Sequence, residues 1–157
     1  MSLAAPTSQA IDGAAFRIAV VAARYNEELA DGLLARVLAG LRAAGVKEKN
    51  LTVVRVPGSH EVPVAAAILE AKTRADCVIG LGVLIGGDTN HHEMVGQSVS
   101  QALQTLALAS GTPIINGVIV VNTLAQARAR CTGKIDRGME FARAALEMAA
   151  LKRKFSP

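Results

Sequence analysis

The sequence predicts an α/β fold in which a four-stranded parallel sheet lies between two layers of helices. Two observations predict it. Short apolar runs alternate along the chain with longer segments whose apolar residues recur at helical spacing, and parallel strands require crossovers of this kind. One run, CVIGLGVLI, is apolar on both alternating sets of positions, which is typical of a strand buried on both faces. The 157 residues are enough for one domain with a sizeable core.

Several predicted elements begin or end beside a residue that favours a boundary. The first helix stops at Gly45 and the third at Gly111, and glycine is common at helix ends. Pro57 and Gly58 end the second strand, while Pro63 lies in the first turn of the second helix, where a missing N–H costs little. The predicted strands are residues 16–23, 51–56, 75–85 and 112–121. The predicted helices are residues 26–45, 61–73, 91–110, 123–131 and 138–155.

The composition argues against several classes of function. Aromatic residues make up only 3% of the chain, with no Trp, which leaves too few rings for a protein that reads stacked bases. The formal charge is +4, and the basic residues are scattered except in the C-terminal LKRKF, where a solvated helix end is expected rather than a polyanion-binding patch. No apolar run reaches the roughly 18 residues that would predict a membrane span. Neither a nucleic-acid partner nor a membrane partner is expected.

Residues 1–15 are predicted to be a flexible N-terminal arm, and residues 16–157 to be a single domain. The arm lacks the charged start and apolar centre of a signal peptide, so a cytoplasmic protein is expected. The two cysteines match no metal-binding spacing. Cys77 lies in an apolar run and is predicted to be in the core, whereas Cys131 follows basic residues and is expected to be partly exposed.

Ligands of parallel sheets bind where the strands end, so four loops are candidate binding segments: ARYNEE, VPGSHEVP, LIGGDTNHH and VVNTLAQ. In the third loop, Gly86 and Gly87 let the backbone approach a ligand, and a helix start of this kind favours an anion. A small phosphorylated ligand is one interpretation. A plain glycine turn in which Thr89 caps the next helix is the other, and the spacing does not decide between them. The loop is neither a Walker loop nor a dinucleotide fingerprint.

His91 and His92 open the helix that follows this loop. Neighbouring side chains on a helix point about 100° apart, so at most one of them can face an anion site. A histidine beside such a site can transfer protons near neutral pH, although a surface or capping role is the simpler explanation of a lone histidine. Adjacent histidines are poorly spaced for a metal, so no metal site is expected here.

The first two loops carry weaker signals. Ser59, His60 and Glu61 offer a hydroxyl, an imidazole and a carboxylate at another helix start. Glu61 can be a favourable acid at that start, or it can accept hydrogen bonds from a polyol or an amine. Tyr25, the only tyrosine, can stack on a flat ring or simply pack, and Asn26 can cap the first helix or contact a ligand.

In combination, and in this order, these segments resemble the 6,7-dimethyl-8-ribityllumazine synthase family. The element Gly-x-x-Glu-x-Pro followed by Gly-x-Thr-x-His is specific in combination. The resemblance extends from about Arg17 to Phe155, nearly the whole chain. The segments that carry it are ARYNEE, VPGSHEVPVAA, GVLIGGDTNHHEMV, TPIINGVIVV, AQARAR and RGMEFARAALEMAALKRKF.

The resemblance implies a flavodoxin-like fold and a transferase of riboflavin biosynthesis that needs no metal or redox cofactor. Such an enzyme condenses 5-amino-6-(D-ribitylamino)uracil with 3,4-dihydroxy-2-butanone 4-phosphate to 6,7-dimethyl-8-ribityllumazine, releasing phosphate and water. It also implies a homopentamer, in some members a decamer or a 60-subunit icosahedral shell, with active sites between adjacent subunits.

Roles for individual residues follow from the same resemblance. His91 matches the proton-transfer histidine, and Tyr25 would stack on the pyrimidine. The phosphate-binding residues would be Gly87, Asp88, Thr89 and the Arg130 of a neighbouring subunit. The remaining contacts to the ring and the ribityl chain would be Asn26, Ser59, His60, Glu61, Val83, Leu84 and Asn116.

The chain departs from the usual family pattern at several positions. Gly86 stands where many members have Arg or Lys, and Asn116 where a Phe often reaches into the neighbouring site. His92 replaces a common aromatic residue, and CTGKIDRG is a residue shorter than usual, which leaves the roles of Lys134 and Arg137 open. Asn116, and Tyr25 where the family usually has Phe or Trp, support a second hypothesis, a flavin- or lumazine-binding homologue with weak or no turnover. A pentamer or a pair of pentamers is expected rather than a shell.

Overall fold

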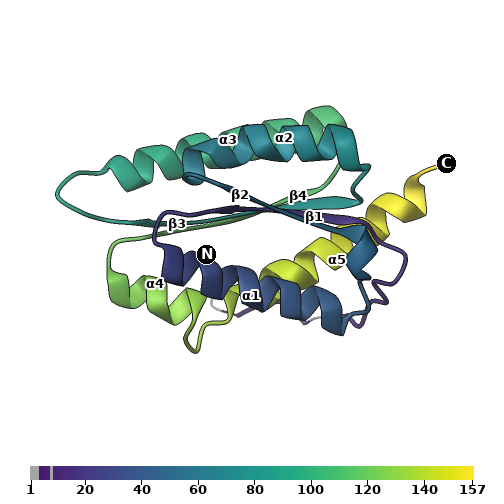
Figure 1. The fold of residues 1–157 in the computed structure, drawn as a ribbon, viewed down its shortest axis with the longest axis horizontal. Helices are drawn as coiled ribbons and strands as arrows, with labels where there is room; N and C mark the ends of the chain where they lie inside the picture. Colours follow the sequence, from purple (N-terminus) through teal and green to yellow (C-terminus); the bar gives the residue numbers. More distant parts are fainter. Residues whose placement is uncertain (1–3, 8) are drawn as a thin grey trace.

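The four predicted strands form one parallel sheet in the computed structural model, which describes residues 4–7 and 9–157 (Figure 1). The strands are β1 (Ile18–Ala23), β2 (Leu51–Val56), β3 (Cys77–Ile85) and β4 (Ile114–Val121). Their order across the sheet is β2-β1-β3-β4, and all neighbouring strands are parallel. The chain therefore moves from β1 to β2 on one side and then returns to build β3 and β4 on the other, which is the flavodoxin-like arrangement.

Helices cover both faces of the sheet, as the sequence predicts (Figure 1). They are α1 (Glu27–Ala43), α2 (Val62–Thr73), α3 (His91–Ser110), α4 (Leu124–Cys131) and α5 (Arg137–Phe155). The helices α2 and α3 lie on one face, and α1, α4 and α5 lie on the other. Along β1, Ile18 and Val20 belong to the core beneath α1, α4 and α5, whereas Ala19 and Val21 belong to the core beneath α2 and α3. Burial on both faces explains the continuous apolar runs of the strands.

The boundaries of the elements fall within two residues of the predicted ones, and those of β2 and α3 agree residue for residue. The strand β1 begins at Ile18 rather than at residue 16, because the preceding N–H groups are used elsewhere. Phe16 N donates to Gly13 O (3.0 Å), and Arg17 N donates to the Asp76 carboxylate (2.8 Å). Two short 3₁₀ turns, Glu48–Asn50 and Ser59–Glu61, have no counterpart in the prediction.

The predicted flexible arm falls partly outside the described residues, which omit residues 1–3 and 8. Its later part is attached to the end of α1. Gly13 is buried, and its N–H donates to Ala44 O (2.7 Å). Ile11 packs, partly buried, against the core beneath α1 and α5. The flexibility of the first residues stays a prediction.

The expectation that Cys131 is partly exposed is wrong. Its side chain is buried, because α4 packs this face of the helix against α1 and the rest of the core. Cys77 is buried in β3, as predicted. Burial raises the pKa of the Cys77 thiol to about 12 and that of Cys131 to about 11. Neither thiol is therefore a reactive thiolate near neutral pH.

Asp76 anchors the end of α5 to the amino-terminal edge of the sheet. Its buried carboxylate accepts hydrogen bonds from Arg153 Nε (2.8 Å), Arg153 Nη2 (2.9 Å) and Arg17 N (2.8 Å). Burial by itself raises the pKa of this carboxyl, but the Arg153 guanidinium and the Arg17 N–H outweigh that effect. The pKa of Asp76 is therefore lowered from its ordinary value, and the folded chain stabilises the carboxylate form.

Lys152 provides a second anchor at the same edge. Its Nζ donates to Ala75 O (3.1 Å) and to Thr112 Oγ1 (3.0 Å), while the Thr112 hydroxyl donates to Glu70 Oε1 (2.9 Å). The expectation that LKRKF is a solvated helix end therefore holds only in part, because the exposed Arg153 also pairs with Asp76 and the half-buried Lys152 donates to Ala75 O and Thr112 Oγ1. Both reach polar groups of the sheet, because α5 crosses the sheet toward this edge (Figure 1).

We expect Asp76→Asn to lower the free energy of unfolding by about 2 kcal/mol at pH 7, because it removes the charge that Arg153 pairs with. Urea denaturation would measure the change. Because the pKa of Asp76 is lowered in the folded chain, its carboxylate stabilises the fold fully at pH values above the pKa of an aspartate in the unfolded chain, about 3.9. This stabilisation is lost as the pH falls through the pKa of Asp76 in the folded chain. The difference between the two proteins should therefore shrink below about pH 4.

Glu48→Gln is the matched control, because Glu48 forms an exposed pair with Arg42. Exposed pairs contribute little to stability, so this variant should unfold like the wild type. An equal loss in both variants, or a loss in Asp76→Asn that persists in acid, would contradict the anchoring role.

Candidate active site

The loops that follow β1, β2, β3 and β4 meet at the carboxyl-terminal edge of the sheet (Figure 1). Backbone hydrogen bonds join neighbouring loops there. Arg24 N donates to Val56 O (2.9 Å), and Tyr25 N donates to Pro57 O (3.2 Å). At the other side of the edge, Gly86 N donates to Val121 O (2.8 Å). These bonds join the loop after β1 to the loop after β2, and the loop after β3 to the end of β4.

Tyr25 and Glu61 converge over the backbone of Gly58. A Cβ atom built on Gly58 would lie 3.2 Å from Tyr25 Cδ2 and 3.1 Å from Glu61 Oε2. The same Glu61 oxygen accepts a hydrogen bond from Gly58 N (2.9 Å), so the carboxylate is fixed against its own helix start. The Tyr25 side chain is 71% exposed. An aromatic ring with an accessible surface thus lies beside a carboxylate, which suits a flat polar heterocycle.

Asn26 lies where the winding direction of the sheet reverses, between β1 and β3. Its backbone is left-handed (φ 56°), and its Nδ2 donates to Val83 O (2.8 Å). This hydrogen bond ties the start of α1 to the end of β3 at the point where such folds bind ligands. The Val83 side chain itself is buried in the core, so only its backbone reaches this edge, while Leu84 is half-buried.

Ser59 and His60 differ in accessibility, although they are neighbours in the turn before α2. Ser59 is buried, and within the described part of the chain its hydroxyl has no hydrogen-bond partner. It faces Gly82, where an added Cβ atom would overlap with Ser59 Oγ. His60 is exposed. In this conformation His60 is therefore open to a ligand, and the Ser59 hydroxyl is not.

The segment before α3 is open to solvent. Gly87, Asp88 and Thr89 are exposed, and so is His91. The N-cap of α3 is Asn90 rather than Thr89, although Thr89 Oγ1 accepts a long hydrogen bond from His91 N (3.4 Å). The N–H groups at a helix start and the helix dipole favour an anion.

The adjacent histidines separate as the helix geometry predicts. His91 is exposed beside the glycine-containing segment. His92 points into the protein, and its Nε2 lies 3.2 Å from Asn122 Oδ1 after β4. Only His91 can therefore act on a ligand at the start of α3.

Asn116 and Arg130 are not brought to this edge in a single chain. Asn116 pairs with Gly80 in the middle of the sheet, five residues before the end of β4, and five residues of strand span ~16 Å. Its Oδ1 accepts a hydrogen bond from Val118 N (3.1 Å). Arg130 turns back on its own helix and donates to Gln126 O (3.0 Å).

Lys134 and Arg137 also lie after α4. Lys134 is exposed, whereas Arg137 is engaged by Glu140 and lies over the Phe141 ring, 4.9 Å from its centroid. Arg137 and Arg130 are therefore both engaged within their own helices, and Lys134 is the exposed cation of this segment.

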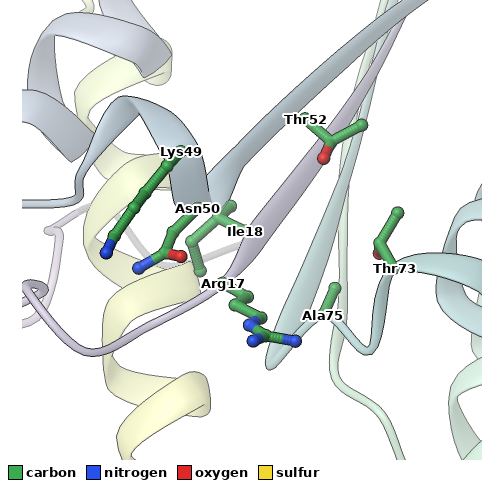
Figure 2. Close-up of a pocket in the computed structure, with 7 residues that line it drawn as sticks. All are labelled: Arg17, Ile18, Lys49, Asn50, Thr52, Thr73 and Ala75. Carbon is green, nitrogen blue, oxygen red and sulfur yellow. The ribbon is translucent and has the colours of Figure 1, made fainter.

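A hollow of about 260 Å³ opens at the opposite, amino-terminal edge of the sheet. Its lining residues are Arg17, Ile18, Lys49, Asn50, Thr52, Thr73 and Ala75 (Figure 2). In Figure 2 the charged ends of Arg17 and Lys49 lie apart and do not meet at a common point. None of the predicted site residues lines this hollow, so the candidate site and the hollow lie at opposite ends of the strands.

Within the described ranges, no group of three or more His, Cys, Asp or Glu side chains could hold a metal ion. No helix of the described chain is long and apolar enough to cross a membrane.

Residues 15–153 match the family model of 6,7-dimethyl-8-ribityllumazine synthase. The chain belongs to this family. A 6,7-dimethyl-8-ribityllumazine synthase of Kineococcus radiotolerans is 45% identical over 150 residues, which cover 94% of this chain and 91% of the relative. A relative of the same name from Methylobacterium radiotolerans is 44% identical, over 94% of this chain and 88% of its own length. Another from a Polaromonas species is 40% identical, over 90% of both chains.

Three residues that shape the site were given no role in it from the sequence, although Gly58 and Gly82 lie in the segments that carry the family resemblance. Gly58 and Gly82 make room for the Tyr25–Glu61 contact and for Ser59. A glycine within a strand indicates a close approach, so the GLG of β3 is a signal that could have found Gly82. Asn122 has no such signal, because its partner His92 is 30 residues away in the sequence.

The left-handed Asn26 provides a direct test of how this edge is assembled. We expect Asn26→Ala to lower the free energy of unfolding by about 1–2 kcal/mol, because it loses the hydrogen bond to Val83 and strains a left-handed residue. Asn26→Gly loses the same hydrogen bond but accepts the conformation, so its loss should be smaller. Chemical denaturation of the three proteins would measure both changes. Equal losses would contradict a strained backbone at Asn26.

Proposed function

We propose that this chain condenses 5-amino-6-(D-ribitylamino)uracil with 3,4-dihydroxy-2-butanone 4-phosphate to 6,7-dimethyl-8-ribityllumazine, releasing phosphate and water. Family membership supports the reaction. The observation that carries the assignment to this edge is the meeting of Tyr25 and Glu61 over Gly58, beside an exposed glycine-containing helix start. One sheet edge thereby offers a surface for a flat ring and a surface for a phosphate.

The pyrimidine substrate would lie against the β1 and β2 loops. Tyr25 stacks on the ring, and Glu61 accepts hydrogen bonds from its N–H or hydroxyl groups through the oxygen that Gly58 does not use. Exposed His60 and the backbone near Val83 and Leu84 contact the ring edge and the ribityl chain. Asn26 holds the loop that carries Tyr25 in place.

The phosphate of the second substrate would lie at the start of α3. The N–H groups of Gly87, Asp88 and Thr89 and the Thr89 hydroxyl donate to it, and the helix dipole favours its negative charge. Arg130 of a neighbouring subunit completes the site, because a guanidinium can hold two phosphate oxygens at once.

The chemistry requires positioning and proton transfer rather than a protein nucleophile. The 5-amino group adds to the ketone and loses water to form an imine. Phosphate then leaves as the proton on the neighbouring, hydroxyl-bearing carbon is removed. The enol that forms tautomerises to a new carbonyl, and the ribityl-bearing nitrogen closes the ring on it with loss of another water. Holding both substrates on one edge accelerates the first step. His91, beside the phosphate, moves the protons of the elimination, typically worth ~10²–10⁴-fold.

A homo-oligomer with shared sites would explain the exposed apolar surface. Val64 and Ile68 of α2 and Met94 and Leu108 of α3 are between 57% and 77% exposed. Surfaces of this kind often become protein interfaces. A neighbour packed there could also bring Asn116 and Arg130 to a site that they do not reach in their own chain. We propose a cytoplasmic pentamer or a pair of pentamers.

The test is to mix the purified protein with both substrates and follow the absorbance of the lumazine. We expect turnover above the spontaneous background. Arg130→Ala should raise KM for the butanone phosphate roughly 10- to 100-fold with a smaller effect on kcat, because it loses charged hydrogen bonds to the phosphate. His91→Ala should lower kcat by ~10²-fold or more while KM changes little.

Arg130→Lys is the matched control: it keeps the charge but not the paired hydrogen bonds, so its KM should lie between those of the wild type and Arg130→Ala. Background-level turnover together with tight binding of riboflavin or the lumazine would overturn the catalytic assignment and favour a carrier.

A further inference from the structure

His92, the buried member of the histidine pair, has a polar partner from another part of the fold. Its side chain is 9% exposed, and its Nε2 lies 3.2 Å from Asn122 Oδ1. This acceptor assigns the ring proton to Nε2, which donates to Asn122. Within the described residues Nδ1 is buried without a hydrogen-bond partner. The Glu93 carboxylate, 4.0 Å from Nε2, is largely exposed. The hydrogen bond to Asn122 is therefore the main polar contact of the ring.

Gly86 makes this contact possible. A Cβ atom on Gly86 would lie 2.9 Å from Asn122 O, 3.1 Å from Asn122 Cα and 3.1 Å from His92 Nε2. The first of these distances is too short for a real side chain, and two of the three involve backbone atoms that cannot move aside. Because Gly86 has no positive φ, space rather than backbone conformation requires the glycine here. Gly86, His92 and Asn122 thus form one packed unit, named here the β3–α3 junction.

The junction joins four elements. Gly86 N donates to Val121 O (2.8 Å), which connects the end of β3 to the end of β4. Asn122 N donates to Gln126 Oε1 (2.9 Å), which connects it to the first turn of α4. His92 belongs to the first turn of α3. The junction is therefore a fixed point for the start of α3.

Residues 87–91 form a short connecting segment between Gly86 and His92, and this segment is called here the excursion. The excursion has little structure of its own: Thr89 Oγ1 accepts from His91 N at 3.4 Å, and Asn90 caps α3 without a side-chain hydrogen bond. Gly87, Thr89 and His91 are exposed. The position of these residues must therefore be set at the two ends of the excursion.

We infer that His92 and Asn122 are positioning residues, which hold the excursion in the geometry that binds the substrate phosphate and presents His91. This inference rests on the proposed function, which makes residues 87–91 the phosphate site. The hydrogen bond, rather than the ring alone, has this role. It links α3 to the segment after β4, and within the described chain His92 forms no other side-chain hydrogen bond that links them. Gly86 serves the same role by leaving space for the contact.

The test compares the wild type with His92→Phe, Asn122→Ala and His92→Gln. Phe keeps a ring without the donor, whereas the Gln amide can place an N–H close to the position of Nε2. We expect His92→Phe and Asn122→Ala to raise KM for the butanone phosphate roughly tenfold, with KM for the ribitylaminouracil unchanged. The double variant should be no worse than either single variant, and His92→Gln should stay close to the wild type.

Two further measurements separate positioning from loss of the fold. The thermal midpoint reports global stability, and amide hydrogen exchange of peptides covering residues 86–92 reports the excursion. We expect faster exchange in this segment alone. Asn50→Ala, an amide removed at the opposite edge of the sheet, is the control and should change neither quantity. Unchanged exchange in His92→Phe, or equal rises in both KM values, would overturn the inference.

Failure of the proposed function would be recognised separately. In that case the wild type would show only the spontaneous background rate of lumazine formation, and the His92 variants would show the same rate. Amide hydrogen exchange of residues 86–92, measured in the wild type and in His92→Phe with and without inorganic phosphate, then tests the positioning role. Phosphate that slows exchange of residues 87–91 in the wild type but not in His92→Phe supports it, and the same response in both proteins overturns it.

Discussion

The position of β3 between two parallel neighbours is the constraint on which the site depends. β3 pairs with β1 on one side and with β4 on the other, and its first seven residues are buried. Because all of the strands run in the same direction, their carboxyl ends and the loops that follow them share one edge. Residues from four distant segments can meet there because β3 keeps its register with both of its neighbours.

The two edges of the sheet differ in how far their polar side chains are already hydrogen-bonded within the chain. At the amino-terminal edge, Asp76, Arg153 and Lys152 pair with one another or with backbone groups, so the charges there stabilise the fold. At the carboxyl-terminal edge, Tyr25 and His91 remain exposed. Polar groups that are already satisfied are poor ligands, whereas groups left open can bind a substrate. The division explains how a small chain keeps a stable core and still presents a site.

Much of this organisation could be predicted from the sequence, because it depends on local patterns. The apolar run of β3, the helical spacing of α3 and the divergence of His91 from His92 all follow from periods of two and 3.6 residues. Contacts between distant segments were beyond such patterns. The burial of Ser59 depends on the missing side chain of Gly82, the burial of Cys131 on the packing of α4 against α1, and the role of His92 on Asn122. The partner of Arg153 was likewise hidden, because Asp76 lies 77 residues earlier.

The proposed phosphate site is shared, with His91 supplied by one subunit and Arg130 by the next. Mixed oligomers test it most directly. Arg130→Ala and His91→Ala subunits are unfolded together, refolded and assayed at a butanone phosphate concentration no higher than the wild-type KM, where each variant alone shows little activity. In a random equal mixture about one site in four combines an intact His91 with an intact Arg130 from its neighbour, so activity should return to about a quarter of the wild-type value. A mixture no more active than its two parents would contradict the account and place both residues in the same subunit's site.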